Sequence, residues 1–311
     1  MDVRDSLDIE TVSAALVTSG VTPGVTPGVA SGRPWRGVEF HPALGSTNTR
    51  LRELLTGASP ASGAYAVSPP DVDPGLWWVV LTDHQTGGRG RLGRVWTVPD
   101  RASLAVSVAV PVTDPAQAGW MPLLAGLALS RAVAEVTEAA GHPLTSRLKW
   151  PNDVLLADDG DRKLSGILCE LVTSGGRSAV VVGTGVNVDQ TRDELPVETA
   201  TSLALAGSAV RREDLLVAYL DHLAGVIVGA GAQVGAPEES GERDAVRTAY
   251  RSACATLGRE VRVHLPTGGA AEGTAVAVDD DGGLVVRTAD GLRTFAAGDV
   301  VHVRAAAGGL A

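Results

Sequence analysis

The chain of 311 residues contains only two cysteines, Cys169 and Cys254. Two cysteines are too few for a disulfide framework or a cysteine-based zinc site. The sequence also lacks any apolar run close to the roughly 18–20 residues needed to cross a bilayer. Its start, MDVRDSLDIETVS, has neither the basic nor the apolar region of a secretory signal. These absences predict a reduced, cytoplasmic setting and no membrane partner.

Positive charge is also scarce. The 26 Lys and Arg residues are outnumbered by 36 Asp and Glu, which gives a formal net charge of −10. This balance argues against broad nucleic-acid binding, which needs a basic face, although a local cationic patch can still bind phosphate. The six histidines show no metal-binding spacing. A Walker A lysine loop and a GxSxG nucleophile motif are absent as well.

The sequence pattern divides the chain into three segments. Residues 1–33 include VTPGVTPGVASG, a Pro/Gly repeat that cannot sustain a helix or bury a core. We expect a flexible N-terminal tail that is dispensable for chemistry and too short for a DNA-binding domain, so DNA is not an expected partner. Residues 34–257 alternate between strand-like and helix-like runs. Residues 258–311 read as short alternating strands between Gly/Asp turns, which predicts a small β-barrel.

Within the middle segment, a Ser/Thr cap at Ser46 or Thr47 predicts a helix that ends near Gly57. Asp114-Pro115 predicts the start of an apolar helix that reaches about Ala140. The Pro/Ser-rich run SPASGAYAVSPPDVDPGL is expected to be a surface loop. Strand-like runs are LWWVVLTDHQ, SLAVSVAVPV, RLKWPNDVLL, KLSGILCELV and SAVVVGTGVNV, and two further helices are expected within RREDLLVAYLDHLAGVIVGA and ERDAVRTAYRSACATLG. Short turns between adjacent strands favour mixed or antiparallel pairing.

The most informative motif is GGRGRLGR, residues 87–94. Its arginines Arg89, Arg91 and Arg94 can bind carboxylate or phosphate oxygens through two parallel hydrogen bonds. Its glycines let the backbone bend toward an anion. The loop is expected to be mobile in the free protein and to close over an anionic small molecule.

Four other motifs offer groups that could line the same cleft. Ser46-Thr47-Asn48 is an ordinary helix cap that could also hold a polar ligand group. Lys149-Trp150-Pro151-Asn152-Asp153 reads as a turn, but Asn can recognise a purine and Asp can hold Mg²⁺. Lys163 precedes an apolar strand with Gly166 at its centre, and a central glycine often marks close approach by a ligand.

The run VGTGVNV, residues 182–188, is not a dinucleotide fingerprint. It has no third glycine, and its apolar residues continue as a strand instead of opening a helix. We expect close ligand approach at Gly183 and Gly185 and a hydrogen bond from Asn187.

Together, GSTN, QTGGRGRLGRVW, KWPNDV, RKLSGIL.E and VGTGVNV, in this order, resemble the biotin–protein ligases (biotin–[acetyl-CoA-carboxylase] ligases). The resemblance spans about Val38 to Arg304. It implies an α+β fold: a class II aminoacyl-tRNA synthetase-like catalytic domain with a mixed sheet flanked by helices, here residues 34–257, and a C-terminal SH3-like β-barrel, residues 258–311. The short tail is similar to the ligase-only type without a DNA-binding domain.

The resemblance implies a two-step reaction in which biotin and MgATP form biotinyl-5′-AMP and pyrophosphate. A lysine of a biotin carboxyl carrier domain then takes the biotinyl group. The implied partners are carrier domains of acetyl-CoA, propionyl-CoA and pyruvate-type carboxylases, with Mg²⁺ as the metal.

The resemblance also implies roles for residues at the matching positions. Lys163, Arg89 and Arg91 would be catalytic, and Asp153 is a candidate for Mg²⁺. The biotin pocket would be formed by Ser46, Thr47, Asn48, Gln85, Arg89, Gly90, Arg91, Lys163 and Gly166. The nucleotide and adenylate would contact Arg89, Arg91, Arg94, Trp96, Lys149, Asn152, Lys163, Gly185 and Asn187.

Three alternatives remain open at this point. A lipoate–protein ligase would share the fold and the adenylation chemistry. A regulator that controls transcription in its ligand-bound form would need a DNA-binding domain. A nicotinamide oxidoreductase would depend on GTGVNV alone. The dense arginine loop with Trp96 and the terminal barrel favour biotin.

Overall fold

The computed structural model describes residues 4–17, 34–58, 65–66, 77–231, 240–265, 268–296 and 298–302. Its centre is an eight-stranded sheet with the order β2-β1-β3-β6-β10-β9-β8-β7. Only β1 and β3 pair in parallel, and the other neighbours are antiparallel, so the sheet is mixed as predicted. In this order the strands are β2 (Tyr65–Ala66), β1 (Trp35–Leu44), β3 (Trp77–Gln85), β6 (Ser103–Val112), β10 (Arg177–Asn187), β9 (Arg162–Ser174), β8 (Asp153–Leu156) and β7 (Ser146–Lys149).

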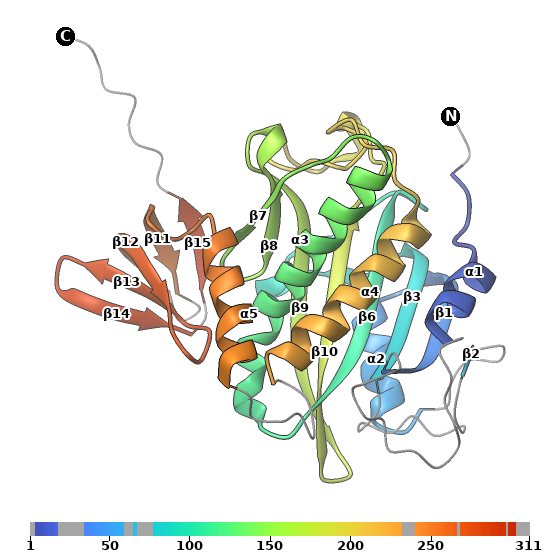
Figure 1. The fold of residues 1–311 in the computed structure, drawn as a ribbon, viewed down its shortest axis with the longest axis horizontal. Coiled ribbons are helices and arrows are strands. Elements are labelled where there is room, and N and C mark those ends of the chain that lie inside the picture. Colours follow the sequence, from blue (N-terminus) through green and yellow to red (C-terminus); the bar gives the residue numbers. More distant parts are fainter. Residues whose placement is uncertain are drawn as a thin grey trace.

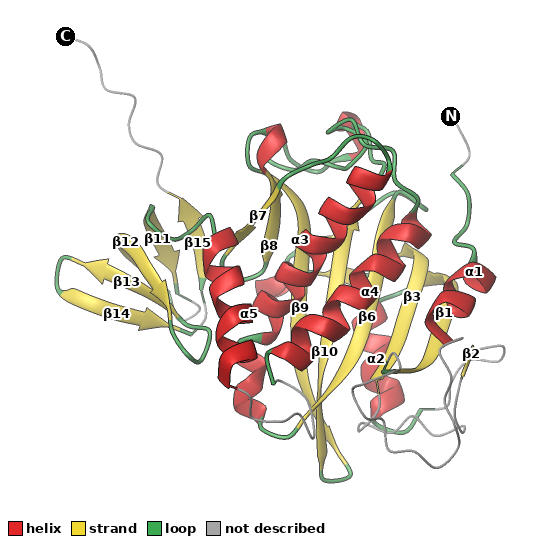
Figure 2. Ribbon diagram, in the orientation of Figure 1, coloured by secondary structure: helices red, strands yellow, loops and turns green. Residues whose placement is uncertain are grey.

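Helices cover both faces of this sheet (Figure 1). On one face lie α3 (Met121–Ala139) and α4 (Arg212–Gly229), with α5 (Ser240–Ala253) beside them and α1 (Ile9–Val17) at the edge near β1. On the other face lies α2 (Thr47–Leu55). The helices and strands form layers, as the secondary-structure colouring shows (Figure 2). The predicted α+β architecture is confirmed.

The apolar residues of the strands supply two cores because successive side chains point to opposite faces of a sheet. On β3, Val79 and Leu81 belong to the larger core under α3 and α4. Trp78 and Val80 belong to the smaller core under α2, with Leu51. All ten residues of β6 are buried, which explains its nearly uniform apolar sequence.

Two expected elements differ in detail. The run RLKWPNDVLL is a hairpin of β7 and β8, in which Trp150–Asn152 form the turn and Trp150–Pro151 is a cis peptide. Asp114 caps a short 3₁₀ helix (Pro115–Gly119), and α3 starts only at Met121. Most of the expected surface loop SPASGAYAVSPPDVDPGL lies outside the described residues, except Tyr65–Ala66, which pair with β1.

The prediction of a flexible tail is wrong for the start of the chain. Residues Arg4 to Val17 are ordered, and Leu7, Ile9, Val12 and Leu16 are buried in the larger core. The spacing of Ile9, Val12 and Leu16 is that of an amphipathic helix. The prediction missed it because residues 1–33 were assigned to a tail on the basis of the Pro/Gly repeat. The repeat itself lies outside the described residues.

The C-terminal segment forms a separate five-stranded antiparallel sheet with the order β14-β13-β12-β11-β15. Its strands are β11 (Glu260–His264), β12 (Ala270–Val278), β13 (Leu284–Thr288), β14 (Gly291–Phe295) and β15 (Asp299–His302). This is the small all-β unit expected from the alternating sequence.

The turn between β12 and β13 attaches this sheet to the rest of the molecule. The indole N–H of Trp120 donates to Asp280 O at 2.8 Å, and that of Trp150 donates to Gly282 O at 2.9 Å. Gly119 lies against the backbone of Asp281, where a side chain would overlap its carbonyl oxygen. These contacts bring β15 to the edge of the cleft described next.

Candidate active site

A pocket of about 1100 Å³ lies between the central sheet, the arginine loop and the C-terminal sheet. Every site residue predicted from the sequence lines it. These are Ser46, Thr47, Asn48, Gln85, Arg89, Gly90, Arg91, Arg94, Trp96, Lys149, Asn152, Asp153, Lys163, Gly166, Gly185 and Asn187. The structure therefore brings five motifs, spread over some 140 residues of sequence, to one cavity.

One end of the pocket is a network of buried polar groups at the start of α2. Ser46 caps the helix, and its Oγ accepts from Thr49 N at 3.4 Å. The next residue, Thr47, donates its backbone N–H and its hydroxyl to Gln85 Oε1 at 3.0 and 3.1 Å. Ser107 on β6 completes the network, since its Oγ lies 2.7 Å from Thr47 Oγ1. Ser107 was not predicted from the sequence, although a serine in the middle of an apolar strand could have indicated it.

Asn48 is held by hydrogen bonds to β9 and β6. Its Nδ2 donates to Leu168 O at 3.2 Å and to Glu170 Oε2 at 2.8 Å, and its Oδ1 lies 2.6 Å from Ser107 Oγ. A side chain at Gly183 would overlap the Asn48 amide. The expected close approach at Gly183 is thus made by Asn48, not by an open surface for a ligand.

Trp96 occupies the corresponding position further along the same strands. A Cβ at Gly185 would lie 2.8 Å from the indole ring, and one at Gly166 would lie 3.5 Å from it. The two glycines let the ring lie against the sheet. Its Nε1 is buried and has no hydrogen-bond partner among the described residues. A buried unpaired donor is costly, so this group is available to a bound molecule.

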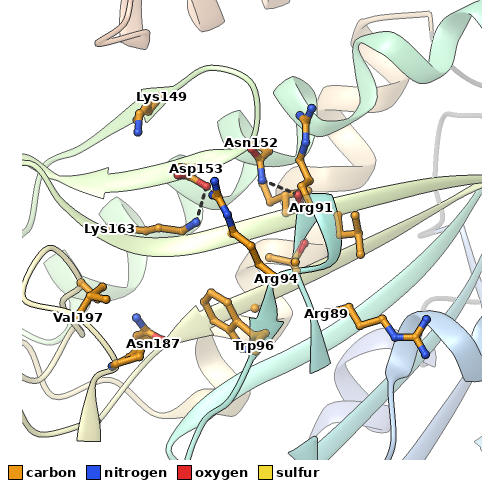
Figure 3. Close-up of a pocket in the computed structure, with 18 of the residues that line it drawn as sticks. Arg89, Arg91, Arg94, Trp96, Lys149, Asn152, Asp153, Lys163, Asn187 and Val197 are labelled. Carbon is orange, nitrogen blue, oxygen red and sulfur yellow. Dashed lines mark hydrogen bonds and ion pairs between the residues drawn. The ribbon is translucent and has the colours of Figure 1, made fainter. Parts of the chain in front are cut away.

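Lys163 and Asp153 meet at the floor of the pocket. Their Nζ and Oδ1 atoms are 2.7 Å apart, and their side chains are 34% and 18% exposed. Their strands β8 and β9 are paired, with Asp153 opposite Gly166. Figure 3 shows that Arg94 reaches toward the same carboxylate from the arginine loop. The Asp153 carboxylate therefore pairs with Lys163 and also interacts electrostatically with Arg94.

The arginine loop is a tight hairpin of β4 (Gly88–Arg89) and β5 (Val95–Trp96) around a 3₁₀ turn, Arg91–Gly93. At its tip Leu92 adopts a left-handed backbone conformation, with φ 57°. Burial lowers the pKa of the Arg91 guanidinium, whose contact with Gly298 O is long, at 3.5 Å. A desolvated cation with so weak an acceptor favours an incoming anion.

The other two arginines of the loop differ from Arg91. Arg94 forms an ion pair with Asp299 of β15. Arg89 is exposed, and in Figure 3 it extends away from Lys163 on the far side of Trp96. The three arginines therefore do not converge on one point.

The two predicted asparagines of the nucleotide side already have protein partners. Asn187 donates to Thr201 O at 2.8 Å and accepts from Gln190 Nε2 at 3.0 Å. Asn152 donates to Ile167 O at 2.9 Å. In this arrangement their amides fix the pocket wall and the turn after β7.

The C-terminal sheet contributes a wall that the sequence did not predict. Arg259, Asp299 and His302 line the pocket, and Arg259 pairs with Asp161 at 3.1 Å. Burial, with the charges of Lys149 and Arg259, lowers the pKa of His302 to about 4. These residues have no motif of their own, because only the docking of the small sheet places them here.

The charge distribution suits an anionic ligand. Six lysine and arginine side chains line the cavity, and three carboxylates lie among them: Arg89, Arg91, Arg94, Lys149, Lys163 and Arg259, with Asp153, Asp161 and Asp299. Within the described residues no three His, Cys, Asp or Glu side chains are grouped to hold a metal ion. No helix in that part of the chain is long and apolar enough to cross a membrane.

Comparison with known proteins gives the family. The model of the biotin/lipoate A/B protein ligase family matches residues 76–187, and that of the biotin protein ligase C-terminal domain matches residues 256–303. The biotin–[acetyl-CoA-carboxylase] ligase of Mycobacterium tuberculosis is 38% identical over 88% of this chain and 92% of its own length. The chain belongs to the biotin protein ligase family.

Other members of the family agree. The biotin–[acetyl-CoA-carboxylase] ligase of Paracoccus denitrificans is 32% identical over 74% of this chain and 92% of its own length. The Aquifex aeolicus biotin protein ligase, solved with biotin and ATP, has a TM-score of 0.63 and 26% identity, and the match covers 86% of this chain and 99% of the other. The match to the C-terminal domain model, residues 256–303, includes both Arg259 and His302.

Proposed function

We propose that this chain is an ATP-dependent biotin–protein ligase. In the first step the carboxylate of biotin attacks the α-phosphorus of MgATP, pyrophosphate leaves, and biotinyl-5′-AMP forms. In the second, the amine of a carrier lysine attacks the acyl carbon, and AMP leaves. The observation that carries the proposal is the single pocket that joins a polar end at α2 to a cationic floor at Lys163.

The polar network at the start of α2 would receive biotin. Ser46, Thr47, Asn48 and Gln85 present hydroxyl and amide groups that are already oriented by one another. Such preorganised groups lose little entropy when they bind a ureido ring. A Cβ at Gly166 would lie 3.3 Å from Lys163 Nζ, so the glycine leaves room for the lysine.

The cationic groups would stabilise the charge that develops at the α-phosphate. Lys163 lies beside Asp153, and Arg91 is the desolvated cation of the loop. Positioned cations in a site with little water stabilise a phosphoryl transition state without reorganising. Arg89, exposed at the other end of the loop, would close over biotin only if the loop moves.

Trp96 and the strands beneath it would hold the nucleotide. The indole face rests on Gly166 and Gly185, and Arg94, Lys149, Asn152 and Asn187 line the same pocket. An aromatic face binds a purine by stacking. Because Asn187 is already bonded to Thr201, its contribution would be to the shape of this wall.

Asp153 fits a Mg²⁺ that arrives with ATP. Protein Mg²⁺ sites commonly use one or two carboxylates together with substrate phosphates, and Asp153 has a second oxygen besides the one paired with Lys163. Mg²⁺ bound there would offset phosphate charge. Carrier domains of acetyl-CoA, propionyl-CoA and pyruvate-type carboxylases are the proposed acceptors.

The test is biotin-dependent exchange of labelled pyrophosphate into ATP, with lipoate as a matched acid. We expect exchange with biotin and at most a trace with lipoate. Exchange with lipoate alone would make the chain a lipoate ligase, and exchange with neither would reject adenylation.

A further inference from the structure

The ordered N-terminal segment contacts the segment that builds one wall of the active site. Arg4 Nη2 lies 2.6 Å from Glu194 Oε2, its Nη1 lies 3.1 Å from Oε1, and its Nε lies 3.0 Å from Asp189 Oδ1. The guanidinium thus holds two carboxylates at the two ends of one short turn. The side chain of Arg4 is 22% exposed and that of Glu194 30%.

Glu194 is fixed by more than the ion pair. Its Oε2 also accepts from Thr191 N at 2.9 Å, within the capping box of the 3₁₀ turn Arg192–Glu194. The hydrogen bond from Arg4 is the main cause that lowers the pKa of Glu194 to about 2. The carboxylate is therefore charged throughout the physiological range, and so is its partner.

The turn leads directly into the pocket wall. Pro196, Val197, Thr199 and Ala200 line the cavity. Arg192 Nη1 donates to Ala200 O at 2.8 Å, which ties the turn to the wall.

The same wall is hydrogen-bonded to the backbone of Lys163. Lys163 N donates to Thr199 O at 2.8 Å, and Thr201 N donates to Lys163 O at 2.9 Å. A path of short contacts therefore runs from Arg4 through Glu194 and the turn to residues 199–201 and Lys163.

The N-terminal segment is itself well anchored, so it can act as a fixed point. Leu7 N donates to Asp83 Oδ1 at 3.1 Å, and Asp83 also pairs with Arg212 at 2.8 Å. Asp8 N donates to Glu213 Oε1 at 2.9 Å. Both anchoring side chains on α4 are buried.

We propose that Arg4 is a positioning residue of the active site: it holds the turn at residues 189–194 and so fixes the wall at residues 196–201 and the backbone of Lys163. The kinetic part of this inference rests on the proposed ligase activity. The structural part does not, because it concerns only contacts within the chain. It replaces the expectation that the whole start of the chain is dispensable.

The first experiment is hydrogen exchange on the full chain without substrates. Arg4→Ala is compared with the wild type and with Arg262→Ala, a matched control that removes an exposed arginine–glutamate pair on the C-terminal sheet. We expect faster exchange at residues 189–201 and at the Lys163 amide in Arg4→Ala alone. Unchanged exchange there, or the same change in Arg262→Ala, would overturn the proposal.

The second experiment measures pyrophosphate exchange kinetics. We expect kcat to fall roughly three- to tenfold in Arg4→Ala, the range of coupling changes through such networks, with the KM for ATP much less affected, because Lys163 acts on the charge that develops in the transition state. Arg4→Lys should restore part of the effect, and Arg4→Ala with Glu194→Gln should be no worse than either single change. Additive effects would contradict action through Glu194.

The two experiments separate this proposal from the proposed function. If the wild type catalyses no biotin-dependent pyrophosphate exchange, the ligase proposal fails. Faster hydrogen exchange at residues 189–201 in Arg4→Ala would still support the positioning role. If the wild type is active and both readouts of Arg4→Ala match the control, the positioning role fails alone.

Discussion

Lys163 combines three properties that separate it from the other cations of the pocket. Its Nζ contacts Asp153, its backbone is bonded on both sides to residues 199–201, and its side chain is about one-third exposed. The backbone contacts fix the position of the Lys163 main chain. The partial exposure of the side chain leaves its Nζ within reach of a ligand. The lysine is thus held at its base by the backbone, and its partly exposed tip pairs with Asp153.

Replacing Lys163 with alanine should slow adenylate formation by about a hundred- to a thousandfold. The loss corresponds to roughly 2.7–4 kcal/mol, the value of one preorganised contact to a developing charge. Single-turnover formation of biotinyl-5′-AMP measures it, with the melting temperature as a check on folding. A wild-type rate in the variant would remove Lys163 from the mechanism.

Arg91 should also hold the adenylate after it has formed. Its burial and its weak contact with Gly298 O make a bound phosphate its best partner. Arg91→Gly should raise the dissociation rate of biotinyl-5′-AMP at least about tenfold, which is about 1.4 kcal/mol. A chase with unlabelled biotin measures this rate. Arg94→Ala is the matched comparison and should have a smaller effect, because Arg94 already pairs with Asp299.

At the scale of elements, the arginine loop combines a paired base with exposed apolar side chains. Its base is the β4–β5 hairpin, in which Trp96 pairs with Gly88 and Val95 with Arg89. Leu92 at the tip and Val95 on β5 are 59% and 79% exposed although both line the pocket. Large apolar side chains exposed at a pocket mouth favour closure over a ligand.

Biotin with MgATP should protect this loop from trypsin. The four glycines at residues 87–93 make the open loop flexible, and an anion would relieve the repulsion among its arginines. We expect cleavage after Arg89, Arg91 and Arg94 to slow with both substrates present, relative to cleavage after Arg262 in the same digest. Equal rates with and without substrates would show that the loop does not close.

The elements and the members of the site were largely predictable from the sequence, but several contacts were not. The motifs mark the pocket because small and charged residues there interrupt apolar strands. The partners of those residues come from distant strands, so the sequence could not show that Asn48 fills the space above Gly183. The same holds for Asn187, whose amide donates a hydrogen bond to Thr201 O. The role of Arg4 could not be predicted, because the Pro/Gly repeat that follows hid the signal of the buried helix Ile9–Val17 beside it.

At the scale of the whole molecule, the C-terminal sheet is part of the pocket. Trp150 connects the two units: its indole N–H bonds to Gly282 O, and its backbone N–H donates to Thr256 Oγ1 at 3.0 Å. Thr256 in turn lies 3.2 Å from His302 Nε2. His302 is therefore placed where the two units meet, beside Lys149 and Arg259.

This position makes the attachment of the small sheet sensitive to acid. The pKa of His302 falls from 6.5 to about 4 on folding, so the unfolded state binds more protons between these values, and stability must rise with pH across that window. The effect should be on the order of 1 kcal/mol, because the partial exposure of His302 screens it. Melting temperatures from pH 4 to pH 7 measure it.

His302→Gln is the control for this dependence, since glutamine keeps a polar side chain but does not titrate. The variant should lose stability more slowly than the wild type between pH 6.5 and pH 4. Identical slopes would show that other groups set the pH dependence and that His302 is not desolvated.

The central claim is tested most directly by transfer of labelled biotin to a biotin carboxyl carrier domain. The protein is incubated with biotin, MgATP and the carrier, beside a carrier whose acceptor lysine is replaced by arginine. We expect label on the unaltered carrier only, dependent on ATP and strongly reduced with Lys163→Ala. ATP-independent labelling, or none on the carrier while the adenylate accumulates, would contradict it.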